Sequence, residues 1–199
     1  MAEVSASMIK ELRVRTNAGI MDCKEALQEA SGDMEKAVDF LRKKGLATAL
    51  KRAGRETSEG QIGSYIHIGG KIGVLVEVNC ETDFVGKTEE FKEFVKNVAM
   101  HIAATKPLGI GREDLSEEVV KREEEIYRAQ AKEMGKPEKI LDKIVQGKME
   151  KFYKEACLLE QQYVKDTDMN IQDLINEMVS KTGENIAVRR FVRYQLGGE

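Results

Sequence analysis

Residues 61–85 read QIGSYIHIGGKIGVLVEVNCETDFV and contain two runs of alternating apolar residues joined by paired glycines. In the first run Ile62, Ile66 and Ile68 share one face, and the second run has apolar residues at the even positions of 72–80. Alternation with a period of two is typical of strands that bury one face. The stretch therefore predicts a β-hairpin.

The length of the loop decides which faces of the two runs meet. A two-residue Gly69-Gly70 turn would pair even with odd positions and place the apolar faces on opposite sides. A three-residue loop, Gly69-Gly70-Lys71, pairs Ile66 with Val74 and keeps both apolar runs on one side. We therefore predict the three-residue loop.

Apolar residues recur at helical spacing on either side of this hairpin. Before it, residues 6–44 contain three such runs, and a turn at residues 17–19 separates the first two. After it, the spacing predicts helices over 88–104 and 170–181, and two long charged helices that form a hairpin within 114–164. The pattern indicates a helix-rich chain with a small sheet.

The last segment, residues 186–196, alternates like a strand. We expect Arg189, Phe191 and Arg193 on one face and an apolar set on the other. The apolar set comprises Ile186, Val188, Val192, Tyr194 and Leu196.

With the hairpin, this strand predicts a three-stranded antiparallel sheet whose apolar face is covered by the flanking helices, so the expected fold class is α+β. We expect residues 1–54 to form a three-helix module with a basic linker. Residues 55–199 would form a core domain that carries the helical hairpin as an insertion. One edge of so short a sheet is open and needs a partner or a second copy of the chain to cover it.

The composition excludes several classes of protein. The chain has 199 residues, of which 34% are charged, and its net charge of −3 gives no overall attraction for nucleic acid. No segment approaches the ~20 apolar residues that a membrane span needs. The first residues, MAEVSASMIKELRVRT, lack the features of a signal or transit peptide, so we expect a cytoplasmic protein without membrane contact.

Residues suited to cofactor or metal binding are scarce. The three cysteines and two histidines are scattered, and they fit neither a zinc site nor a disulfide framework. Phosphate-binding loops, zinc-protease motifs and nucleophile elbows are also missing. We therefore expect no cofactor, no metal and no catalytic residue, and a binding protein rather than an enzyme.

One basic run, residues 42–55, contains lysines and arginines but no acidic residue. RNA binding is one interpretation of this run. Because it lacks interleaved aromatic residues, the pattern favours a solvated linker helix, and we expect no direct nucleic-acid contact.

Two interpretations of Phe84 remain open from the spacing alone. In the first, Thr82 or Asp83 caps a short helical turn, and Phe84 and Val85 fold back onto the sheet. In the second, Asp83 and Phe84 lie on a tight turn and point outward, where the aromatic ring can anchor a partner. General burial tendencies favour the first interpretation.

Three segments carry a family resemblance: NCETDFV at 79–85, KELRVRTNAGIMDCKEAL at 10–27 and ENIAVRRFVRYQLG at 184–197. They resemble the T-D-F-V signature, the N-terminal three-helix module and the closing strand of the bacterial translation elongation factor Ts family. That module is similar to a ubiquitin-associated fold. The resemblance extends over essentially the whole chain and favours the outward orientation of Phe84.

The resemblance implies a guanine nucleotide exchange factor for elongation factor Tu, a GTPase that holds GDP and Mg²⁺ tightly. The turn Thr82-Asp83-Phe84-Val85 would enter the GTPase near its Mg²⁺ site. Phe84 would lie between two partner helices, while Asp83 sets the turn and disturbs the surroundings of the metal. The N-terminal module would dock on the GTPase domain through Lys10, Leu12, Arg13, Thr16, Ile20 and Met21.

The resemblance also bears on the oligomeric state. Longer relatives carry two core repeats, whereas this chain has sequence for one, so a noncovalent homodimer is expected. The strand 186–196 and the hairpin 114–164 are the candidate surfaces. The alternative functions are a ubiquitin-associated-like adaptor of another pathway and an RNA-binding protein, both without exchange activity.

Overall fold

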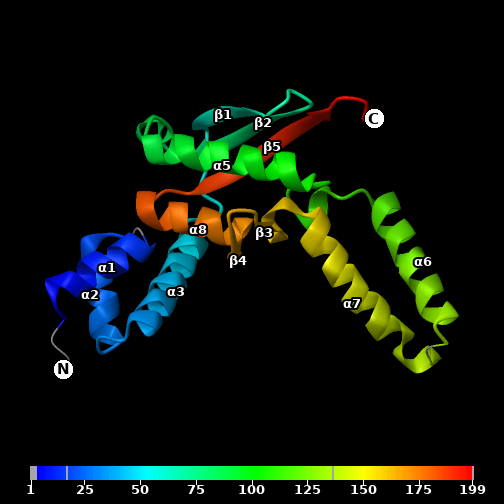
Figure 1. Ribbon diagram of the computed structural model, residues 1–199, viewed down its shortest axis with the longest axis horizontal. Helices are drawn as coiled ribbons and strands as arrows, with labels where there is room; N and C mark the ends of the chain where they lie inside the picture. Colours follow the sequence, from blue (N-terminus) through cyan, green and yellow to red (C-terminus); the bar gives the residue numbers. More distant parts are fainter. Residues whose placement is uncertain (1–3, 17, 136, 199) are drawn as a thin grey trace. The chain divides into compact units, whose positions relative to one another are not determined.

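The computed structural model describes residues 4–16, 18–135 and 137–198 (Figure 1). The chain forms two compact units, each built from segments that are distant in sequence. The first unit comprises the residues up to Gln61, Val78–Phe94 and Asp173–Ala187, and the second comprises Ile62–Glu77, Val95–Gln172 and the chain from Val188 onward. The domain boundary expected after residue 54 stays a prediction.

The three helices expected within residues 6–44 are present. They are α1 (Ala6–Thr16), α2 (Ile20–Glu29) and α3 (Met34–Arg52). The carboxylate of Asp33 caps α3 by accepting a hydrogen bond from the Lys36 backbone N–H at 3.1 Å. The helices bury a small core that comprises Leu12, Cys23, Ala26, Leu27, Ala30 and Ala37.

The ends of these helices add two observations. Helix α3 continues through most of the basic run and ends at Arg52. Of the turn expected at 17–19, Asn17 lies outside the described residues.

The sheet has three antiparallel strands, β1 (Glu59–Ile66), β2 (Ile72–Cys80) and β5 (Ile186–Gln195), with β2 in the middle. Together with the helices, this sheet confirms the α+β fold class. The buried side chains of β2 are Val74, Val76, Val78 and Cys80, as the alternation predicts.

The prediction of a three-residue hairpin loop is wrong. The His67 N–H donates to the Ile72 carbonyl at 2.9 Å, and the Gly70 N–H donates to the His67 carbonyl at 2.9 Å. His67 is therefore opposite Ile72, and the four residues 68–71 form the loop. Gly69 and Gly70, with φ of 92° and 68°, supply the left-handed conformation that this loop uses.

This register turns the isoleucines of β1 away from the buried face of β2. Ile62 and Ile66 are 70% and 68% exposed, so their predicted packing with that face is wrong. A Cβ built on Gly63 would overlap the Val95 side chain of helix α5 (Glu89–Thr105). Gly63 therefore faces α5, because only a residue without a side chain allows so close an approach.

Strand β5 departs from the predicted alternation in its second half. Ile186 and Val188 are buried as predicted. Val192, Tyr194 and Leu196 are exposed, so their predicted place on the buried face is wrong.

Arg193 gives the physical reason for this change of face. Its guanidinium donates from Nε and Nη2 to the Ala103 carbonyl oxygen, at 3.2 and 3.1 Å. Ala103 lies in the last turn of α5, where carbonyl groups lack helical partners and favour a positive charge. Arg189 and Arg190 are both exposed and mark the point at which the alternation shifts.

Three further helices agree with the predicted order. They are α6 (Glu117–Glu133), α7 (Glu138–Ala156) and α8 (Ile171–Thr182). A second antiparallel sheet, β3 (Gln162–Tyr163) and β4 (Asp166–Asn170), was not expected. Its residues are too few and too polar to show an apolar alternation.

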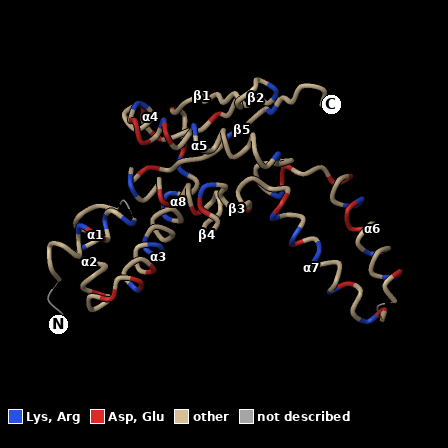
Figure 2. Tube along the Cα trace, viewed as in Figure 1, with Lys and Arg blue, Asp and Glu red and all other residues tan. Residues whose placement is uncertain are grey.

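Helices α6 and α7 form the expected antiparallel hairpin (Figure 1), with acidic and basic residues interspersed along both (Figure 2). Arg112 ties α7 to the following turn, since its guanidinium donates to Glu150 at 3.0 and 2.8 Å and to Glu160 at 2.5 and 2.8 Å. The buried residues of the hairpin comprise Ala131, Leu141, Val145, Met149 and Ala156.

Gly60 offers a test of the strand packing. It has a φ of 135°, and a Cβ built on it would overlap the Val78 carbonyl oxygen. We expect Gly60→Ala to lower the free energy of unfolding by about 2 kcal/mol or more, because both the backbone and the contact become strained. Urea unfolding followed by circular dichroism measures this change.

Gly147, within α7, provides the matched control. A Cβ there meets no described atom within 4 Å. Gly147→Ala should therefore raise the free energy of unfolding by about 0.5–1 kcal/mol through helix propensity. Equal effects of the two substitutions would contradict the packing described for Gly60.

Candidate partner-binding site

The segment between β2 and α5 forms one short helical turn, α4 (Asp83–Gly86). Close backbone packing fixes the place of this turn. A Cβ on Gly86 would lie 3.4 Å from both the Cα and the carbonyl oxygen of Gly60. The side-chain amide of Gln61 donates to the Gly86 carbonyl at 2.8 Å. Helix α4 is thus held against the first residues of β1.

Phe84 points outward from this turn, and its side chain is 80% exposed. The interpretation in which Phe84 folds back onto the sheet is therefore wrong. Val85 is half-buried, so only one of the two apolar residues of the turn packs inward. Thr82 stands at the N-cap position of α4, but its side chain makes no capping hydrogen bond.

Thr88 links α4 to α5 through two hydrogen bonds. Its hydroxyl donates to the Val85 carbonyl at 2.8 Å and accepts from the Phe91 backbone N–H at 3.2 Å. Thr88 therefore caps α5, as a threonine does at the start of a helix. Because Phe91 is fully buried, this cap joins the exposed turn to a rigid helix.

Asp83 forms an ion pair with Lys87, one turn along the chain, at 2.5 Å. The hydrogen bond from the Lys87 ammonium lowers the pKa of the Asp83 carboxyl below its usual value, and Asp83 raises the pKa of Lys87. The carboxylate thus stabilises the turn from the side next to Phe84.

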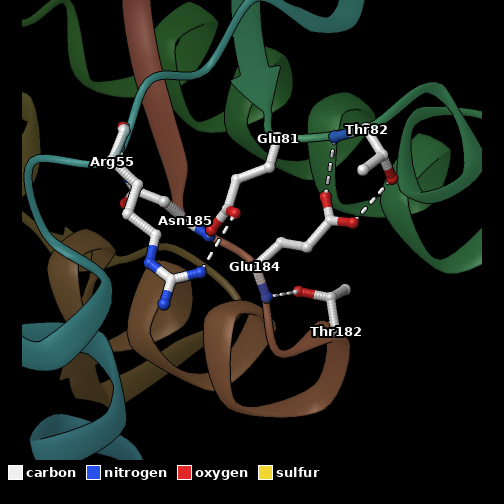
Figure 3. A network of polar contacts seen from close by, with 6 residues as sticks. All are labelled: Arg55, Glu81, Thr82, Thr182, Glu184 and Asn185. Carbon is white, nitrogen blue, oxygen red and sulfur yellow. Dashed lines mark hydrogen bonds and ion pairs between the residues drawn. The ribbon is translucent and has the colours of Figure 1, made fainter.

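Thr82, immediately before the turn, is held by a residue far along the chain (Figure 3). One carboxylate oxygen of Glu184 accepts from the Thr82 backbone N–H at 3.0 Å, and the other accepts from the Thr82 hydroxyl at 2.6 Å. This bond explains why the Thr82 hydroxyl does not cap α4. Glu184 lies in the connection between α8 and β5.

Glu81 makes the reciprocal contact (Figure 3). Its carboxylate accepts from the Asn185 backbone N–H at 2.6 Å and pairs with Arg55 at 3.4 Å. The Asn185 side-chain amide donates to the Arg55 carbonyl at 2.8 Å. The Asn185 N–H, and then Arg55, lower the pKa of the Glu81 carboxyl below its usual value. We call Glu81, Thr82, Glu184 and Asn185 the carboxylate bridge.

Most of the residues expected to dock the N-terminal module are on its surface. Ile20 and Met21 are 56% and 73% exposed, and Lys10 and Arg13 are exposed as well. Leu12 is fully buried in the core of the three helices, so the prediction that it contacts a partner is wrong.

Thr16 and Val14 complete this surface. Thr16 is half-buried and donates from its hydroxyl to the Leu12 carbonyl at 2.8 Å, which stabilises the last turn of α1. Val14 is 79% exposed and was not among the expected docking residues. Its place off the apolar stripe of α1, between Arg13 and Arg15, is the sequence feature that could have found it.

Three further points about the described residues concern metal binding, the cysteines and membrane-spanning helices. They contain no group of three or more His, Cys, Asp and Glu side chains arranged to hold a metal ion. All three cysteines are buried and free, and burial raises the pKa of the Cys157 thiol to about 11. Within the same part of the chain, no helix has the length and apolar character to cross a membrane.

Three basic residues of the run 42–55 form ion pairs with acidic residues. Arg42 pairs with Asp173 at 3.3 Å, and Arg55 pairs with Glu81. Lys44 pairs with both Asp22 and Glu25. These ion pairs compete with any phosphate for the same cations and favour the linker interpretation.

Comparison with known proteins identifies the family of this chain. The sequence profile of the family described as Elongation factor TS matches residues 6–198. The chain belongs to the elongation factor Ts family. An elongation factor Ts of Desulfosudis oleivorans is 64% identical over 197 residues, which cover 99% of this chain and 100% of the relative.

Two further relatives agree with this assignment. An elongation factor Ts of Syntrophobacter fumaroxidans is 63% identical over 197 residues, covering 99% of this chain and 98% of the relative. One of Geobacter metallireducens is 61% identical over 194 residues, covering 98% and 90%. These matches confirm the family resemblance that was inferred from the T-D-F-V signature and the two other segments.

The ion pair at the turn predicts a measurable titration. Because the pKa of Asp83 is lowered in the folded state, its stabilising contribution is present above about pH 3.9 and is lost as the pH falls through the folded pKa. We expect Lys87→Met to raise the pKa of Asp83 toward its ordinary value, as measured by carboxyl ¹³C NMR. Lys96→Met, in α5, removes an exposed charge elsewhere and should leave the Asp83 titration unchanged. An unchanged titration in Lys87→Met would contradict the ion pair.

Proposed function

We propose that this chain promotes the release of GDP from elongation factor Tu by inserting Phe84 near the Mg²⁺ site of that GTPase. Nucleotide exchange on elongation factor Tu is the known role of the elongation factor Ts family, to which the chain belongs. The observation that carries the mechanism is the 80% exposed ring of Phe84 on a turn restrained on several sides.

In this proposal, two surfaces of the protein contact elongation factor Tu. The exposed residues of α1 and α2, Lys10, Arg13, Ile20 and Met21, dock on the GTPase domain of elongation factor Tu, and Thr16 shapes the end of α1. The turn Thr82–Val85 then places Phe84 between two partner helices, while Asp83 perturbs the surroundings of the metal. The factor makes and breaks no covalent bond, so it acts as a binding protein. Its role in translation elongation places it in the cytoplasm.

The energy of the exchange step can be bounded. Coupling is reciprocal, so a factor that weakens GDP binding is itself bound more weakly when GDP is present, by the same ratio. Each tenfold change corresponds to about 1.4 kcal/mol. Burying the Phe84 ring contributes roughly 1.5–3 kcal/mol, which supplies about one or two factors of ten. The loss of Mg²⁺, whose charge stabilises the phosphates, and the wider interface supply the rest.

Restraint of the turn reduces the entropy cost that would otherwise offset the burial energy of Phe84. An exposed aromatic ring on a flexible loop would lose conformational entropy on binding, and that loss would offset part of the burial energy. Here Gln61, Thr88 and Glu184 each hold the backbone of the turn by a hydrogen bond of 3.0 Å or less. The backbone from which the ring projects is therefore restrained before the partner arrives.

Removing the ring tests the proposal. We expect Phe84→Ala to slow stimulated GDP release by about 10- to 100-fold, because the burial energy is lost from the nucleotide-free complex. Release of fluorescent GDP from elongation factor Tu, followed by stopped flow, measures the rate. Since Phe84 is exposed, the circular dichroism spectrum and thermal midpoint should hardly change.

Met134 supplies the matched control, as a large apolar side chain that is 66% exposed at the end of α6. Met134→Ala should leave GDP release at the rate of the unsubstituted protein. If Phe84→Ala releases GDP equally fast, the proposed mechanism is wrong. A ubiquitin-associated-like adaptor or an RNA-binding protein would give that result, since neither uses this turn.

We also propose that two copies of the chain associate through the exposed face of the sheet. Five apolar side chains there are between 38% and 70% exposed, and all belong to the second unit. The Glu77–Arg190 ion pair, at 2.7 Å, lies on the same strands. An exposed apolar patch of this kind favours association with a second copy. The five residues are Ile62, Ile66, Leu75, Val192 and Tyr194.

A charge placed on this face tests the dimer. We expect Ile66→Glu to weaken self-association by about 100-fold or more, because the carboxylate would be buried without a partner. Sedimentation velocity at micromolar concentration should find the unsubstituted protein as a dimer and the variant as a monomer. Leu50→Glu, at a residue of α3 that is 70% exposed, should remain a dimer. A monomeric unsubstituted protein would contradict this proposal.

A further inference from the structure

We propose that Glu184 is a positioning residue for nucleotide exchange, which acts by holding the backbone from which Phe84 projects. This inference rests on the proposed function of Phe84 and adds to it a residue that does not itself touch the partner. The observation behind it is the carboxylate bridge, which joins the β2–α4 turn to the α8–β5 connection (Figure 3).

Glu184 acts on the residue that begins the turn. Both of its carboxylate oxygens bind Thr82, one at the backbone N–H and one at the hydroxyl, at 3.0 and 2.6 Å. Hydrogen bonds to a carboxylate are shorter and stronger than those between neutral groups. Two such bonds on a single residue restrain both the position of Thr82 and the direction in which the chain enters α4.

The bridge is reciprocal, and this makes it rigid. Glu81 accepts from the Asn185 N–H while Glu184 accepts from Thr82, so each connection sends a carboxylate to the backbone of the other. The contacts join residues that are 102 and 104 positions apart in sequence. The Glu184 N–H in turn donates to the Thr182 hydroxyl at 3.3 Å, which restrains Glu184 itself.

Arg55 extends the bridge to the segment that follows α3. Its guanidinium pairs with Glu81, and its carbonyl accepts from the Asn185 side chain at 2.8 Å. The chain that leaves the N-terminal docking helices is therefore attached to the same bridge as the Phe84 turn. Both proposed partner-contacting segments depend on one set of polar contacts within the first unit.

The bridge has little to contribute to a hydrophobic core, because its members are polar and partly exposed. Glu184 makes two bonds to Thr82, which is itself exposed and lies directly before Asp83 and two positions before Phe84. Burial does not demand so specific an arrangement. The two bonds instead restrain the residue from which the chain enters the turn, where Phe84 is 80% exposed.

The test is a double-mutant cycle in stimulated GDP release. We expect Glu184→Ala to slow release by about tenfold, because two charge-assisted bonds that orient the turn are lost. Glu184→Gln keeps one acceptor oxygen and should lose less. In a Phe84→Ala background, Glu184→Ala should change the rate by less than about twofold, because the ring that it positions is absent.

Two measurements separate positioning from stability. All rates are taken at a temperature where circular dichroism shows each variant fully folded, and Glu184→Gln serves if Glu184→Ala does not fold. Glu117→Ala removes a surface carboxylate elsewhere in the protein, one that pairs with Lys121 at 3.0 Å, and should leave the rate unchanged.

The outcomes distinguish the two proposals. Equal losses from Glu184→Ala with and without Phe84 would overturn the positioning role, because the coupling between the residues would be zero. A full rate in folded Glu184→Ala, together with a slow Phe84→Ala, would overturn the positioning role alone. A full rate in Phe84→Ala would overturn the proposed function and this inference with it.

Discussion

The reciprocal hydrogen bonds between two glutamates and two backbone N–H groups constrain the turn that carries Phe84. Glu81 and Glu184 lie at neighbouring strand connections, and each binds the chain next to the other. The short helix α4 is thereby held between the middle strand and α5, with Phe84 directed to solvent. A large aromatic side chain normally gains stability from burial. Phe84 lacks that gain, and hydrogen bonds from Gln61, Thr88 and Glu184 hold the backbone of its turn instead.

The rest of the fold supports this turn from both sides. Gly60 and Gly86 allow two backbone segments to approach closely, and Thr88 begins α5 immediately after the turn. Helices α1 and α2 carry a separate exposed set that includes Val14, Ile20 and Met21. In the proposed mechanism, the difference in affinity between the GDP-bound and nucleotide-free partner comes from burial of the ring in the nucleotide-free complex, and restraint of the turn lowers the entropy cost of that burial.

The predictable part of the fold was the part with strong periodicity. The helices and the buried residues of β2 follow from spacing alone, whereas the hairpin register depended on a choice between loops that spacing does not settle. The close approach at Gly63 and the Arg193 bond to a helix end decided which faces are buried. At the candidate site, the signature revealed Phe84, but Glu184 could not be inferred, because its contact spans 102 positions of sequence.

In the proposed mechanism, elongation factor Tu buries the Phe84 ring, which is exposed in the free protein. Fluorine NMR of a single 4-fluorophenylalanine incorporated at position 84 measures this most directly. In the free protein, the account predicts a resonance that shifts between H₂O and D₂O, as an exposed ring requires. In the nucleotide-free complex, that solvent shift should disappear. A ring that remains equally sensitive to solvent in the complex would contradict the account.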